Sequence, residues 1–247
     1  MMSLTSANMN VVVKRQYLFK LKANIDAFSS LIGIQVIALL FSLGGMGMSG
    51  SSSSYFTLTV RSYSADVVLA FTMIWGLVTA ITITTRPYRN FDFTFVTNRL
   101  TSNLSNVLFL VTASLLGGVT SILSGYLVRV AGYFFLGHTL YSSEMAVGEL
   151  IIGIIAASLY ILTASSIGYL FGTLAQVSKA FIIVIPALLI GFLFLDISFN
   201  PMPIQQEIYQ FYFIESSFIL FLIKILLTTA ILFGTSSILF NRMGVRQ

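Results

Sequence analysis

The chain has 247 residues, of which 57% are hydrophobic and 9% are charged, and its formal net charge is +5. Soluble domains carry about 25% charged residues, so this chain has too few polar side chains to cover a water-soluble globule. The composition, with a mean hydropathy of +0.94, therefore predicts an integral membrane protein. The positive charge does not indicate nucleic-acid binding, because the basic residues lie between apolar runs and no basic patch alternates with stacking aromatic residues.

The first 26 residues form a basic segment ahead of the first apolar run. Its four cations are Lys14, Arg15, Lys20 and Lys22. Apolar residues at helical spacing predict an amphipathic helix at the membrane interface: Val13, Tyr17, Leu21 and Ile25. A partly ordered basic tail is the alternative. The segment is about as long as an entire signal peptide, and further long apolar runs follow, so we expect an uncleaved first span.

Six long apolar runs follow one another along the chain. They cover residues 27–48, 65–85, 104–128, 149–171, 180–199 and 217–239. A hydrocarbon core of about 30 Å needs about 20 helical residues, and continuous apolar runs favour helices over the alternating strands of a barrel. The sequence therefore predicts an all-α polytopic protein in which residues 27–247 form one transmembrane domain of six helices.

Basic residues predict the orientation of these spans. Six spans place both termini on one side, and the loops of that side carry ten basic residues: Lys14, Arg15, Lys20, Lys22, Arg86, Arg89, Arg99, Lys179, Arg242 and Arg246. The opposite side carries Arg61 and Arg129. By the positive-inside rule both termini are cytoplasmic.

Small residues recur every four positions in the third and fourth spans. The two stripes are Gly117, Ser121 and Gly125, and Ala164, Gly168 and Gly172. Such stripes let helix backbones approach closely. We expect both to be helix-packing faces.

The polar connection 86–103 between the second and third spans mixes basic and bulky apolar residues. Its main members are Arg89, Phe91, Phe93, Phe95 and Arg99. A short loop has no need of several bulky apolar side chains, so they indicate a surface that docks on another molecule. The alternative is a membrane-surface helix whose arginines extend toward the lipid headgroups.

Lys224 is the ionisable residue that lies deepest in a predicted span, about two turns into the sixth. An unpaired charge at that depth is costly, so a functional role is one interpretation. A structural ion pair with Glu215 or Asp196 is the other, and we favour it.

Sequence motifs for catalysis are missing. The chain has no G-x-x-x-x-G-K-[ST] phosphate loop, no H-E-x-x-H pair and no G-x-S-x-G elbow, and His138 is its single histidine. We therefore expect no enzyme active site, no cofactor and no bound metal.

The layout resembles the permease subunits of type 2 ABC exporters. The shared features are six spans with both termini inside, a basic amphipathic lead, an amphipathic connection between spans two and three, and an extended outer segment, here 200–216, before the last span. The resemblance implies that 86–103 holds a coupling helix, with Arg89, Phe91, Phe93, Phe95 and Arg99 docking on a separate ATPase subunit. It also implies re-entrant or interfacial helices in 200–216, which Pro201 and Pro203 delay until about Ile204.

The function expected from this resemblance is export of a hydrophobic or amphipathic substrate, such as a peptide, lipid or drug. The partners would be an ABC ATPase, a second permease copy or related permease, and the bilayer of a bacterial cell membrane. The alternative function is a non-transporting membrane protein that acts as an immunity or sensor protein. An ion-driven carrier would show internal repeats or acids at mid-membrane, and no acid lies near a span centre.

Overall fold

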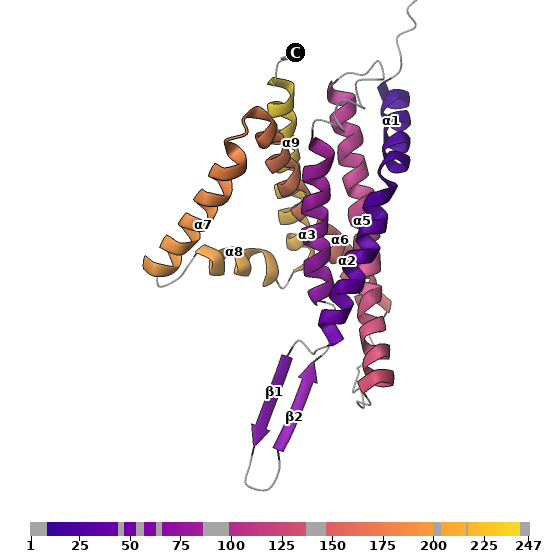
Figure 1. Ribbon diagram of the computed structural model, residues 1–247, viewed down its shortest axis with the longest axis vertical. Coiled ribbons are helices and arrows are strands. Elements are labelled where there is room, and N and C mark those ends of the chain that lie inside the picture. Colours follow the sequence, from indigo (N-terminus) through magenta and orange to yellow (C-terminus); the bar gives the residue numbers. More distant parts are fainter. Residues whose placement is uncertain are drawn as a thin grey trace, which may run out of the picture. The chain divides into compact units, whose positions relative to one another are not determined.

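A computed structural model describes residues 9–43, 47–52, 57–62, 66–85, 99–136, 147–199, 204–215 and 217–242. Its helices, shown in Figure 1, are α1 (Met9–Ala23), α2 (Ile25–Leu43), α3 (Asp66–Thr84), α5 (Arg99–Leu136), α6 (Val147–Val177), α7 (Phe181–Phe199), α8 (Ile204–Phe213) and α9 (Phe218–Arg242). Strands β1 (Gly47–Ser52) and β2 (Thr57–Ser62) form an antiparallel hairpin.

The class predicted from composition is confirmed, because the described chain is helical apart from this hairpin and is rich in apolar helices. Five described helices are long and apolar enough to cross a membrane: α2, α3, α5, α6 and α9. The predicted fifth span corresponds to α7, whose apolar part is the shorter stretch Phe181–Asp196. The count of six spans and the orientation of the termini stay predictions.

Several element boundaries differ from the predicted spans. α5 has 38 residues and α6 has 31, so at 1.5 Å per residue both exceed the roughly 30 Å hydrocarbon core. Strand β1 begins at Gly47, inside the first predicted span 27–48, and the hairpin was not predicted from the sequence. α8 begins at Ile204, where the two prolines were expected to allow a helix to start.

The chain divides into two compact units. Unit 1 contains residues 1–16, 80–107 and 166–247, and unit 2 contains residues 17–79 and 108–165. Helices α1, α3, α5 and α6 contribute residues to both units. Each unit is described separately below.

The core of unit 2 lies where α2, α3 and α5 meet around Trp75, the chain's only tryptophan. Trp75 packs with Leu31 and Ala113. Its indole Nε1 donates hydrogen bonds to the Ala27 carbonyl at 3.1 Å and to the Ser30 hydroxyl at 3.0 Å. The buried indole therefore satisfies its donor while its ring fills the core.

Glycines bring the helices of unit 2 into backbone contact. A Cβ at Gly118 of α5 would lie 2.7 Å from the Ser158 nitrogen and 2.9 Å from the Ser158 Cα of α6, and a Cβ at Gly76 of α3 would lie 2.7 Å from Ser165 Oγ. Both predicted small-residue stripes are buried or half-buried, which confirms them as packing faces. Among the described glycines of unit 2, the closest approach to a neighbouring backbone lies at Gly118, one residue beyond Gly117 of the predicted stripe.

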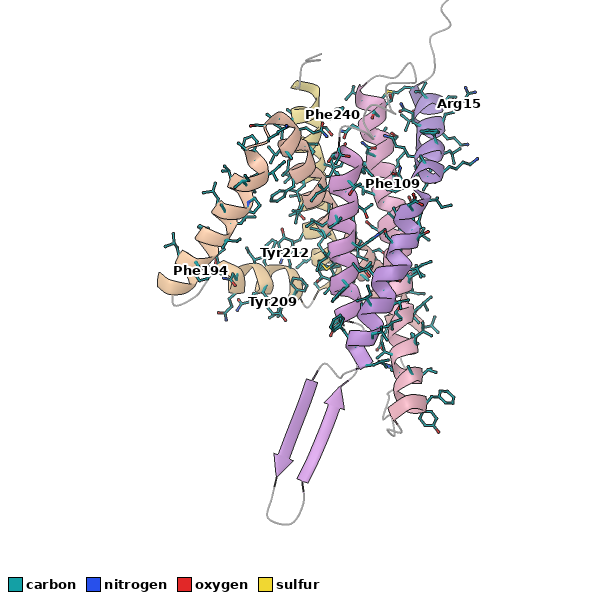
Figure 2. The ribbon with its side chains drawn as sticks, viewed as in Figure 1. Arg15, Phe109, Phe194, Tyr209, Tyr212 and Phe240 are labelled. Carbon is teal, nitrogen blue, oxygen red and sulfur yellow. The ribbon has the colours of Figure 1, made fainter. Side chains whose placement is uncertain are left out.

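In unit 1, α8 runs between the ends of α7 and α9 (Figure 1). The buried side of α9 is a continuous stripe at helical spacing: Phe221, Ile225, Thr229, Phe233, Ser236 and Phe240. α7 is exposed along nearly its whole length and α8 has no buried residue. Figure 2 shows Phe194 on α7 and Tyr209 and Tyr212 on α8.

The basic lead is helical as predicted, but its buried side differs from the predicted stripe. Val13 is buried, whereas Ile25 is 63% exposed and begins α2. The buried positions are mostly polar: Gln16, Lys20 and Asn24. The hydrophobic pattern was misleading here because exposed apolar residues, such as Leu18 and Phe19, are more common on α1 than buried ones.

Candidate functional site

Most of the predicted docking surface lies outside the described residues. Arg89, Phe91, Phe93 and Phe95 belong to 86–98, which the structure does not describe. Arg99 begins α5, and its side chain is also outside the described part. The residues that immediately follow it are described, and they form a polar site that the sequence reasoning did not single out.

The first two turns of α5 have buried polar side chains and exposed leucines. The buried polar residues are Thr101, Ser102, Asn103, Ser105 and Asn106. Leu100 and Leu104 are 47% and 46% exposed. In a bilayer this pattern turns leucines toward lipid and polar groups toward other helices, where hydrogen-bond partners are available.

Asn103, Asn106, Tyr169 and Ser237 form a hydrogen-bonded chain within unit 1, which we call the asparagine–tyrosine network. Asn106 Nδ2 of α5 donates to Tyr169 Oη of α6 at 3.2 Å, and Tyr169 Oη donates to Asn103 Oδ1 of α5 at 2.5 Å. Asn103 Nδ2 then donates to Ser237 Oγ of α9. Ser237 Oγ donates to the Phe233 carbonyl at 2.7 Å.

The network joins three helices by directional bonds. The ring of Tyr169 also packs against Phe233, with 5.8 Å between ring centroids. Each interhelical hydrogen bond in a membrane protein contributes about 0.6 kcal/mol on average and up to about 1.7. Burial makes the bonds mutually dependent, because removing one partner leaves the other unsatisfied.

Lys224, the predicted intramembrane charge site, contacts the C-terminal end of α8. Its Nζ forms a salt bridge with Glu215, lies 3.5 Å from the Phe211 carbonyl oxygen and lies 4.2 Å from the centroid of the Phe211 ring. Of the two expected partners, Glu215 is the one that pairs. The structure thus shows an ion pair at Lys224, the interpretation that the sequence favoured.

Asp196, the other expected partner, contacts the opposite end of α8. Its carboxylate is buried and accepts a hydrogen bond from the backbone N–H of Ile204, the first residue of α8. An acid at the N-terminus and a cation at the C-terminus both match the helix dipole. α8 is therefore held at both ends by charges of the favourable sign.

Gln35 is a buried amide in the middle of the first predicted span, and the sequence reasoning missed it. Its Nε2 donates to Thr72 Oγ1 of α3 at 3.2 Å and to Thr120 Oγ1 of α5 at 2.8 Å. Both threonines also donate to carbonyls of their own helices. This amide cross-links three helices of unit 2.

These arrangements position helices and provide no reaction centre that we can identify. Among the described residues, no group of three or more histidine, cysteine or carboxylate side chains is placed to hold a metal ion. The asparagine–tyrosine network offers amide and hydroxyl groups for hydrogen bonding, and it contains neither a carboxylate nor a histidine. Its chemical role is to fix the relative positions of α5, α6 and α9.

Comparison of the chain with protein-family models, curated proteins and solved structures found no match. One sequence signal does point to the network: the run LTSNLSN places leucines at positions 100 and 104 with polar residues between them. In a membrane the leucines of such a helix face lipid, so this pattern indicates a helix whose polar side packs against protein.

Proposed function

We propose that the chain is the permease subunit of an ABC exporter, which moves a hydrophobic or amphipathic substrate with ATP hydrolysed by a separate subunit. The observation that carries this proposal is the asparagine–tyrosine network. Its two asparagines lie in the first two turns of α5, where the connection expected to dock on the ATPase ends. Three cross-helix hydrogen bonds link these turns to α6 and α9.

This arrangement supports mechanical transmission, in which the ATPase moves the connection and the network carries the movement into the bundle. A force on the start of α5 acts on Tyr169 through buried hydrogen bonds and on Ser237 through a half-buried one. The chain itself supplies no ATP-binding motif, so the energy comes from the partner. A second permease copy, or a related one, supplies the opposite wall of the pathway at a two-fold interface.

The test is to change the expected anchor. Phe95→Ala should leave the protein inserted in the membrane but weaken copurification with an ATPase that carries a phosphate-loop motif, because a buried anchor costs about 2 kcal/mol or more when truncated. Substrate-stimulated ATP hydrolysis should be lost in the same variant. Phe134→Ala is the matched control, since Phe134 is 75% exposed near the other end of α5.

Two results would contradict this proposal. A normal ATPase complex in the double variant Phe91→Ala, Phe95→Ala would favour a helix that lies on the membrane surface. Failure of any such ATPase to copurify with the unmodified protein in mild detergent would favour the immunity or sensor protein. Charge reversal at Arg99 adds an independent check, because a docking defect should be partly rescued by a reversed charge on the ATPase.

A further inference from the structure

Helix α9 carries cross-helix contacts near both of its ends, all within unit 1. Toward its C-terminal end, Ser237 accepts a hydrogen bond from Asn103 of α5. Near its N-terminal end, Lys224 pairs with Glu215 and covers the Phe211 ring of α8. Thirteen positions separate Lys224 from Ser237, which corresponds to roughly 20 Å along a helix.

We propose that α9 is a rigid connector that transmits a displacement of the start of α5 to α8. Lys224 is the side chain of α9 that contacts α8. The source of the displacement rests on the proposed function, since the ATPase would move the start of α5. The connector itself is a property of this chain. It joins the asparagine–tyrosine network to a helix at the opposite end of α9.

The rigidity of α9 follows from its sequence and burial. The helix is continuous over Phe218–Arg242 and contains no proline. Its buried stripe includes Ile225, Thr229 and Phe233, which lie on one side between the two contact points. A helix anchored along one side in this way moves as a unit, because bending it would break backbone hydrogen bonds or expose that side.

The two ends of α8 differ in how easily they can be released. The Asp196 side chain of α7 is 4% exposed and accepts a hydrogen bond from the backbone N–H of Ile204. The N-terminal end of α8 is therefore fixed by a contact with a buried carboxylate. The Lys224 and Glu215 side chains are 27% and 17% exposed. No residue of α8 is buried, and Lys224 contacts the Phe211 ring of α8 and Glu215 just beyond its C-terminal end.

A movement of α9 therefore acts on α8 through Lys224. The lysine makes its carboxylate, carbonyl and ring contacts from a single flexible side chain. When α9 shifts, Lys224 either pulls the C-terminal end of α8 with it or loses all these contacts together. Either response couples a change at Asn103 to the state of α8, and the coupling has a physical path through named contacts.

Hydrogen exchange of α8 amides in the purified chain tests this directly, without an ATPase. Lys224→Met should accelerate exchange in α8 about tenfold, because several contacts to a charged group are lost. Ser237→Ala, at the other end of α9, should accelerate the same amides about threefold, a smaller effect because only one hydrogen bond to the connector is removed. Amides of α2 in unit 2 should be unchanged and serve as the internal reference.

Ser236→Ala is the matched control for Ser237→Ala. Both hydroxyls bond a carbonyl of their own helix, but Ser237 also accepts from Asn103. Unchanged α8 exchange in Ser237→Ala, or equal effects of Ser236→Ala and Ser237→Ala, would overturn the connector. If Lys224→Met does not fold, Glu215→Gln tests the same ion pair. Unchanged α8 exchange in Glu215→Gln would equally overturn the proposed connector.

The outcome is separable from that of the proposed function. Faster α8 exchange in Ser237→Ala, with normal exchange in Ser236→Ala, supports the connector even if no ATPase copurifies with the chain. Loss of ATPase binding in Phe95→Ala, with α8 exchange independent of Ser237, supports the permease function and overturns the connector.

Discussion

Tyr169 and Asn103 are joined by a 2.5 Å hydrogen bond in which the phenol donates to the side-chain carbonyl, and both residues are buried. The phenol oxygen also accepts from Asn106. One hydroxyl group therefore satisfies two amides of α5 from a different helix.

Tyr169→Phe should lower the free energy of unfolding by about 1–2 kcal/mol, because the ring contact with Phe233 is retained while Asn103 and Asn106 each lose a partner. Denaturant unfolding in detergent micelles, followed by helical circular dichroism, measures the change. Tyr133→Phe is the matched control, since Tyr133 is 60% exposed. Equal stability of the two variants would show that the Tyr169 hydroxyl contributes nothing to stability.

Gly118→Ala should destabilise unit 2 by more than about 2 kcal/mol, because the new methyl group meets backbone atoms of Ser158 and α5 and α6 must separate. Trp75 fluorescence reports the change, since Trp75 lies in the core of the same unit. Gly132→Ala is the control: nothing lies within 4 Å of its Cβ position, so we expect no loss of stability. A Gly118→Ala protein with wild-type unfolding would rule out the close crossing.

Gln35→Leu should cost less than about 1 kcal/mol despite the burial of this amide. Thr72 and Thr120 keep hydrogen bonds to carbonyls of their own helices, so neither hydroxyl is left unsatisfied when the amide is removed. Thermal unfolding followed by Trp75 fluorescence measures the stability lost in Gln35→Leu. A loss of several kcal/mol would mean that the cross-link between α2, α3 and α5 is worth much more than the average interhelical bond.

Single cysteines test the predicted orientation in a chain that has none of its own. Ser52→Cys and Gln206→Cys should react with a membrane-impermeant maleimide in intact cells, while a cysteine at position 97 should react only after permeabilisation. Labelling of Ser52→Cys only after permeabilisation would reverse the orientation inferred from the basic residues.

Local sequence determined the class of the protein and much of the helix layout. Apolar runs long enough for a bilayer specify helices whatever their partners are, because unsatisfied backbone groups are too costly in lipid. Small residues four positions apart marked the packing faces for the same local reason. An ion pair at Lys224 was also predicted with Glu215 or Asp196 as partner, and the structure shows the pair with Glu215, nine positions away.

The tertiary structure alone decided which buried polar groups meet. Asn103 contacts Tyr169 and Ser237, which are 66 and 134 positions away, and no local pattern specifies such pairs. The outcome depends on how each helix is rotated and where it crosses its neighbours, which only the packing of whole helices determines. For the same reason the first turns of α5 read as part of a polar connection in the sequence, whereas in the fold their polar side chains are buried between helices.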